Sequence, residues 1–248
     1  MTHGINLKPK NIPTKQTLVL KTKLMPQDIM GILDKKKTSL FGSALRRPKP
    51  DEITVENPQL FLEQVIFVLG HYEIDFNRDT SYVIKVDSDV TEVTIGNKKF
   101  PVLNEFDMWK KFGKKMKYSI GITKQDLEIK VTENVVKNIT DSLYLDNNGL
   151  ETTFSYSTNS DAVENYAQRI LDVNKEYIRR IEITDDAICS KLVQKLKDSF
   201  TLDIKINQEE FIVTEFREMF VPVYEAKCYD KKKKVAIARI DAITGKFL

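Results

Sequence analysis

Apolar and polar residues alternate most regularly in residues 220–248, FVPVYEAKCYDKKKKVAIARIDAITGKFL. Two runs in which apolar and polar residues alternate lie on either side of one aspartate and four consecutive lysines. This period of two is typical of half-buried β-strands. Pro222 has no N–H to give to a sheet, which favours an edge strand or a bulge there. The pattern therefore predicts a β-hairpin with its lysine tip in water. A turn should follow, in which Asp241 binds backbone amides and Gly245 takes a positive φ.

The first third of the chain shows a similar order of elements. Pro26 suits the first turn of a helix, here over about 26–34, and the almost wholly apolar run at 60–69 predicts a central strand. Residues 77–80 then predict a turn that leads into a return strand over 82–86.

Residues 19–93 and 178–247 can be aligned without a gap across their helices. Three apolar positions of the first segment then fall opposite three of the second: Leu24, Ile29 and Leu33 opposite Ile183, Ile188 and Leu192. We interpret this as an internal duplication. The alternative is that ordinary α+β patterning aligns by chance.

The middle of the chain fits neither segment. Residues 118–131 predict a strand, a turn at 124–126 and a second strand, and residues 143–156 predict a hairpin over an Asn-Gly turn. An apolar stripe at helical spacing predicts the longest helix over about 161–180.

The sequence thus predicts an α+β fold: two related helix-plus-antiparallel-sheet units with a β-rich insert and a long connecting helix. The expected divisions are a flexible basic lead, a first α+β unit, a β-rich insert, and a long helix with the second unit, at residues 1–16, 17–103, 104–160 and 161–248.

The C-terminal segment resembles a PepSY domain. The resemblance lies in the hairpin and in the ending Ile-Asp-Ala-Ile-Thr-Gly-Lys-Phe at 240–247; it covers about 181–248, with a weaker copy at about 19–95. It implies one helix followed by antiparallel strands, and a binding or inhibitory unit without a catalytic group. PepSY modules often lie outside the cytoplasm, whereas this chain shows no export signal at its start.

Composition is that of an ordinary folded protein, with 41% hydrophobic and 30% charged residues. The net charge is only +3, but it is unevenly distributed. Residues 1–50 carry 11 basic and 2 acidic side chains, a balance of +9, and residues 51–100 carry 4 basic and 10 acidic, a balance of −6. The basic segment therefore either meets an acidic partner or lies across the acidic segment that follows it.

No catalytic or metal-binding motif is present. The chain lacks a Gly-rich phosphate loop, GxSxG, HExxH and paired CxxC. Its two histidines, His3 and His71, and its two cysteines, Cys189 and Cys228, are scattered, and both cysteines are expected to be small buried residues. We therefore expect no enzyme activity and no cofactor.

The candidate binding residues lie in two basic segments, of which the second also carries aromatic rings. They are Arg46, Arg47 and Lys49 in a loop, and Trp109, Lys110, Lys111, Lys114, Lys115 and Lys117 in a second segment. Rings beside cations could stack on bases and pair with phosphates. At helical spacing, however, the rings of 109–118 share one side, so an amphipathic helix packed on the core explains that segment equally.

These observations favour a non-enzymatic binding module that engages an unidentified protein partner through exposed sheet faces or hairpin edges. The alternative is a nucleic-acid-binding protein that uses the basic N-terminal arm and residues 109–118. No apolar run approaches the length of a membrane span, and two cysteines suit a reducing compartment, so the expected location is the cytoplasm.

Overall fold

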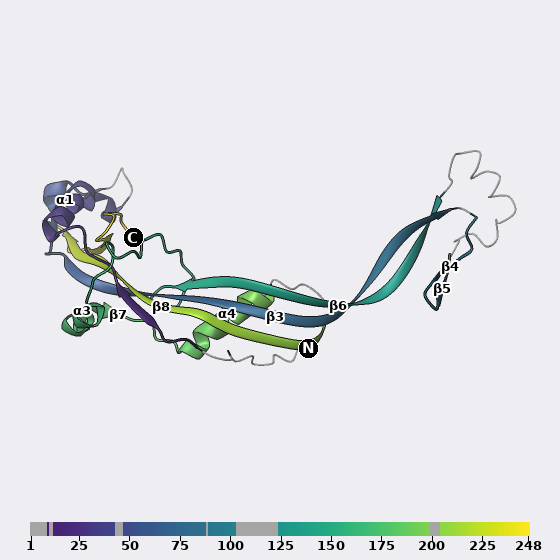
Figure 1. Cartoon of the computed structure of the whole chain (residues 1–248). Helices are drawn as coiled ribbons and strands as arrows, with labels where there is room; N and C mark the ends of the chain where they lie inside the picture. Colours follow the sequence, from purple (N-terminus) through teal and green to yellow (C-terminus); the bar gives the residue numbers. More distant parts are fainter. Residues whose placement is uncertain (1–8, 10–11, 43–46, 88, 103–123, 199–203) are drawn as a thin grey trace. The chain divides into compact units, whose positions relative to one another are not determined.

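The computed structural model describes residues 9, 12–42, 47–87, 89–102, 124–198 and 204–248 (Figure 1). Three long strands dominate them: β3 (Gln59–Asp87), β6 (Lys124–Leu145) and β8 (Lys205–Asp230). The shorter strands are β1 (Gln16–Val19), β2 (Ile53–Val55), β4 (Glu92–Ile95), β5 (Lys98–Pro101), β7 (Ile178–Arg179) and β9 (Val235–Asp241). The helices are α1 (Pro26–Lys36), α3 (Ala167–Val173) and α4 (Asp185–Asp198), with 3₁₀ turns η1 (Lys37–Phe41), η3 (Pro50–Glu52) and η4 (Lys175–Tyr177).

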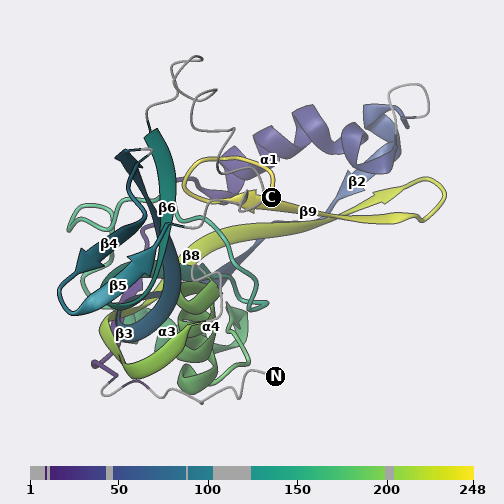
Figure 2. The ribbon, with the colours of Figure 1, turned by 90° about the vertical axis from the view of Figure 1, so that its right-hand side faces the viewer.

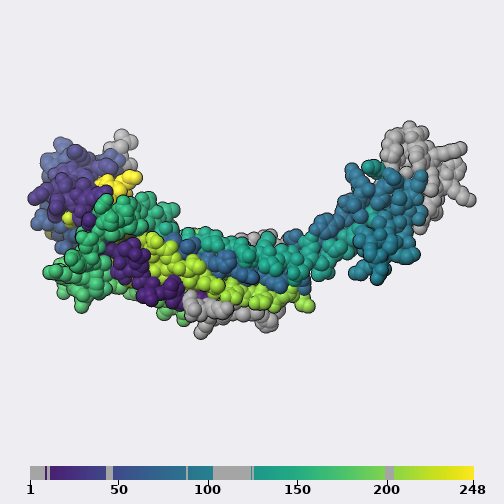
Figure 3. Space-filling model, viewed as in Figure 1, coloured from purple at the N-terminus to yellow at the C-terminus, as the bar shows by residue number. Residues whose placement is uncertain are grey.

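Seven strands form one mixed sheet with the order β1-β8-β3-β6. β2 and β9 pair antiparallel with β8, whereas β1 pairs parallel with β8 and β7 pairs parallel with β3. In Figure 3 the purple surface of β1 lies directly against the yellow-green surface of β8. β4 and β5 make a separate two-stranded hairpin.

The predicted α+β fold with two related helix-plus-sheet units is wrong. Strand makes up 50% of the structure and helix 21%, and early and late strands belong to the same sheet. The predicted helical faces are nevertheless correct, because Ile29 and Leu33 of α1 and Ile188 and Leu192 of α4 are buried. The periodicity was therefore informative within each helix, but the pairing of strands across the chain does not separate into two copies.

The chain divides into two compact units. The first comprises residues 1–72, 139–200 and 210–248, and the second comprises 73–138 and 201–209, so β3, β6 and β8 each contribute to both.

One face of the first unit's sheet, where β2, β8 and β9 pair, is covered by α1 and η1. Figure 2 shows α1 beside β9 and β2. The core between them combines two aromatic rings with aliphatic and small side chains: Ile29, Leu33, Phe41, Ile53, Tyr224, Ala226, Cys228, Ala238, Ile240 and Ala242. The alanines let the helix approach the strands closely.

Elsewhere in the first unit, α4 packs against β3 and β8. Gly70 of β3 lies under the side chains of Leu192 from the helix and Phe211 from β8, and both of these are almost fully buried. The prediction that Cys189 and Cys228 are small buried residues is confirmed, since both are free thiols in the interior.

The second unit is a strand ribbon with a small apolar cluster. The buried residues of this cluster are Val102, Leu127 and Ile129, and Ile74 and Phe76 of the same unit are buried as well. Polar side chains connect neighbouring strands along the ribbon: Asn134 and Asn207 each donate an Nδ2 hydrogen bond to Asp75 Oδ1, at 2.8 and 3.0 Å.

Two predicted turns are continuous strand. Residues 77–80 lie inside β3, and Lys124 begins β6 instead of a turn. Asp79 accepts a hydrogen bond from Thr132 Oγ1 at 2.7 Å, so a residue typical of turns is used between strands. The turn before Gly149 is confirmed, with Gly149 at φ +77°.

The predicted long helix is also much shorter. Only α3 and η4 are helical within 161–180, because flanking residues are engaged by strands. Val163 bridges to Leu20, and Ile178 lies beside Leu62 of β3.

Candidate interaction edge

The C-terminal hairpin is present as predicted. β9 pairs with β8 from Tyr229↔Val235 to Val223↔Asp241. Pro222 lies on β8 between the part that pairs with β1 and the part that pairs with β9, and its carbonyl accepts a bond from Ala242 N at 3.0 Å. The missing amide therefore falls in the interval between two partner strands.

The lysine tip is a short, well-bonded loop. Lys233 N donates to Asp230 O at 2.9 Å, and Asp230 N donates to Lys234 O at 3.1 Å. The Asp230 carboxylate also accepts from Lys234 N at 2.8 Å, and Lys233 takes φ +61°. All four lysines, 231–234, are exposed as predicted.

The outer edge of β9 is partly used by the C-terminal tail. Leu248 N donates to Arg239 O at 3.0 Å, and Asp241 N donates to Lys246 O at 2.9 Å. Backbone groups of alternate residues in an antiparallel strand point to the same side. Since the backbone groups of Arg239 and Asp241 point away from β8, the backbone groups of Val235 and Ile237 also point away from β8. Among the described residues, no strand pairs with this side of Val235 and Ile237.

The same two residues present apolar side chains to solvent. Val235 is 51% exposed and Ile237 55% exposed, whereas Ala236 and Ala238 face the core beneath α1. Edge strands with apolar side chains are ready templates for another strand. We call the outward backbone and side chains of 235–237 the β9 edge.

A salt-bridge network holds the sheet beside the β9 edge. Arg239 Nη2 contacts Glu63 Oε2 at 2.5 Å, and Arg179 contacts Glu63 at 3.0 Å and Glu225 at 2.6 Å. Arg179 also stacks 4.1 Å from the centre of the Phe61 ring. Burial alone would lower the pKa of Arg179, but Glu225 and Glu63 outweigh it and raise that pKa.

The other end of β9 is fixed by the predicted turn. Asp241 is buried and accepts hydrogen bonds from Ile243 N at 2.7 Å, Thr244 N at 3.2 Å and the Thr244 hydroxyl at 2.6 Å. Tyr156 donates to the same carboxylate at 2.9 Å, and burial, followed by this hydrogen bond and the Asp241 charge, raises the pKa of this phenol. Gly245 has φ +71°, as the sequence predicts.

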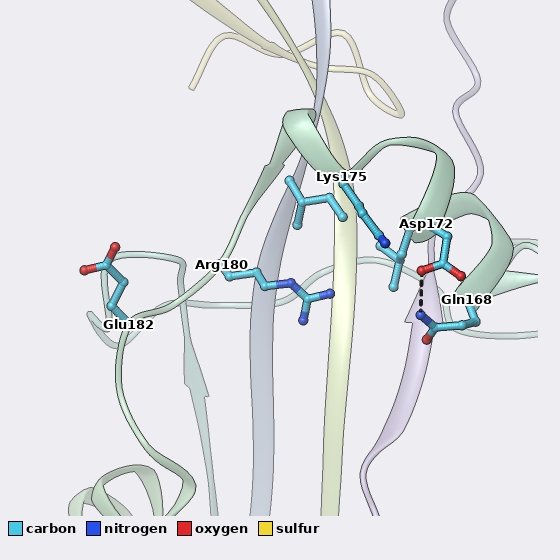
Figure 4. Close-up of a pocket in the computed structure, with 7 residues that line it drawn as sticks. Gln168, Asp172, Lys175, Arg180 and Glu182 are labelled. Carbon is cyan, nitrogen blue, oxygen red and sulfur yellow. Dashed lines mark hydrogen bonds between the residues drawn. The ribbon is translucent and has the colours of Figure 1, made fainter.

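An open hollow of about 450 Å³ lies beside α3 and β7 (Figure 4). Its polar groups are mostly engaged with one another or with the sheet. Gln168 donates to Asp172 at 3.2 Å, and Arg180 pairs with Glu218 at 3.2 Å. Figure 4 shows Glu182 on the opposite side of Arg180 from Gln168 and Asp172, so this carboxylate does not converge with the other polar groups of the hollow.

Of the basic residues singled out in the sequence, the structure describes only Arg47 and Lys49. Arg47 donates to Gly42 O at 3.3 Å, and Lys49 is exposed at the start of η3, where its backbone N–H donates to Glu52 at 3.0 Å. Arg46 and the segment 109–117 lie outside the described residues. Sequence reasoning found the hairpin and expected binding at exposed sheet faces or hairpin edges, but it did not show which edge is free, because that depends on which strands pair.

Comparison of the chain with protein-family models, curated proteins and solved structures found no match. Within the described ranges, no helix has the length and apolar character needed to cross a bilayer. In the same ranges, no three acidic, histidine or cysteine side chains are grouped so as to hold a metal ion.

Proposed function

We propose that this chain is a non-enzymatic protein-binding module whose β9 edge accepts an extended segment of another protein as an additional strand. The observation that supports it most strongly is the coincidence at Val235 and Ile237 of outward backbone groups and exposed apolar side chains. The C-terminal resemblance to PepSY modules, which are binding or inhibitory units, agrees with this proposal.

The β9 edge is prepared for such a role. β8, α1 and the core between them hold β9 on one side, so little ordering is needed before a partner strand binds. Main-chain hydrogen bonds in strand addition provide affinity, and side-chain contacts provide selectivity. Each bond adds only ~0.5–1.5 kcal/mol net, so the few bonds available here predict weak binding unless side chains contribute.

Ile237→Pro tests this function with little effect on the hairpin. The substitution removes an amide that points away from β8, so the β8–β9 ladder keeps its bonds. Ile237→Thr is the matched control, because it keeps both the amide and a β-branched side chain.

Both variants and the wild type would be immobilised and exposed to native lysate, with circular dichroism to verify folding. We expect proteins that bind wild type and Ile237→Thr to be lost with folded Ile237→Pro. An unchanged set of bound proteins on Ile237→Pro would contradict strand addition at this edge.

A further inference from the structure

We propose that the segment accepted by the β9 edge is acidic: an extended peptide with alternating apolar residues followed by several carboxylates. This inference rests on the proposed function and specifies its partner. The lysine tip and the free edge are consecutive in sequence, so one bound strand would contact both.

The charge of the tip is incompletely neutralised. Lys231 pairs with Glu52 at 3.2 Å, and Asp230 is bound by the backbone of the loop. Four lysines against these two carboxylates leave an excess of +2. Among the described residues no ion pair involves Lys232, Lys233 or Lys234.

The free edge at Val235 and Ile237 is close enough to the lysine tip for one short peptide to contact both. A strand rises ~3.4 Å per residue, so a peptide paired with Val235 and Ile237 needs only one or two more residues to reach the lysines. Antiparallel pairing places directly opposed residues in double hydrogen bonds and is slightly more stable per residue than parallel pairing. In that direction the carboxylates follow the apolar residues in the partner's sequence.

A second copy of this chain is a poorer occupant. Its β9 carries the same lysines, and like charges on edge strands oppose pairing. The one carboxylate of β9, Asp241, is buried in the exit turn and already accepts several hydrogen bonds. An acidic partner neutralises the positive charge of the lysine tip, whereas a second copy of this chain does not.

The test uses labelled peptides and fluorescence anisotropy with the full chain. The probe is TVTVTEEE, with TVTVTQQQ as its neutral counterpart and EEETVTVT as its transposed counterpart. A variant with Lys232, Lys233 and Lys234 all replaced by Gln removes the charge, and Ile237→Pro removes the edge. A GSGSGEEE peptide and a short oligonucleotide report on general anion binding.

We expect TVTVTEEE to bind wild type about tenfold more tightly than TVTVTQQQ, because three exposed ion pairs together correspond to about one decade. The difference should disappear in the triple Gln variant and shrink at about 0.5 M salt, where the Debye length is about 4 Å. Both peptides should lose binding to Ile237→Pro.

Equal binding of TVTVTEEE and TVTVTQQQ to wild type, with binding still lost in Ile237→Pro, would overturn the acidic partner and leave strand addition standing. Binding unaffected by Ile237→Pro would overturn strand addition itself. Equally tight binding of GSGSGEEE or of the oligonucleotide would make the tip a general anion site and overturn the proposal. Equal binding of EEETVTVT would overturn the antiparallel direction.

Discussion

Gly70→Ala is the most direct test of the packing between α4 and the sheet. A Cβ at this position would lie 2.6 Å from Phe211 Cε2 and 2.9 Å from Leu192 Cδ2. Phe211 and Leu192 are 1% and 0% exposed, so neither side chain can move into solvent. The methyl group must therefore displace the ring, the helix or the strand.

The expected cost follows from two opposing effects. Overpacking a filled core destabilises a protein by ~1–3 kcal/mol. Replacing Gly by Ala also restricts the unfolded chain, which returns ~0.4–1 kcal/mol. The free energy of unfolding should therefore fall by about 1–2 kcal/mol, and Tm should fall by about 2–4 °C for each kcal/mol in a chain of this size.

Urea unfolding followed by circular dichroism would measure the change. Gly31→Ala in α1 is the matched control, because a methyl group added there would have no atom within 4 Å and alanine favours a helix by up to ~1 kcal/mol. Phe211→Leu should relieve part of the Gly70→Ala cost in the double variant. A Gly70→Ala protein as stable as wild type would refute the packing described here.

Three further outcomes are expected. Asp241→Ala should lower the free energy of unfolding by about 2–4 kcal/mol in urea titrations, since it leaves Tyr156 and the turn amides without their acceptor; a loss below about 0.5 kcal/mol would count against that network. Burial raises the pKa of Cys189 to about 11, with Asp185 and Asp186 adding to it, so iodoacetamide at pH 8 should modify this thiol only after unfolding, and rapid native modification would argue against its burial. Because the pKa of Tyr156 is raised in the folded state, its neutral phenol stabilises the fold fully below pH 10.0, the ordinary pKa, and this contribution is lost as pH rises further. Tyr156→Phe should therefore make the free energy of unfolding fall less steeply with pH in that range, and an identical pH dependence of unfolding in the two proteins would contradict the shift.

Local chemistry could be predicted from the sequence. The hairpin over 220–240, the lysine tip and the turn at Asp241 and Gly245 are all present, because alternation, charge and positive φ act within a few residues. The buried faces of α1 and α4 were correct for the same reason.

Pairing between distant segments could not be predicted. Asn77 and Asp79 indicate a turn by composition, yet in β3 they hydrogen-bond to residues more than 50 positions away. Residues 161–180 have helical periodicity, but Val163 bridges to Leu20 just after β1, and Ile178 pairs with Leu62 of β3. Propensity is a local quantity, and sheet partners override it. For the same reason the sequence could not show which hairpin edge is left without a partner strand.

Amide hydrogen exchange at β9 tests the central claim most directly. Before peptide is added, the amides of Val235 and Ile237 should exchange rapidly. The N–H groups of Ala236 and Ala238 point toward β8 and should exchange slowly. Saturating TVTVTEEE should slow exchange at Val235 and Ile237 specifically. Protection of these two amides before peptide is added, or no added protection at saturation, would contradict the account.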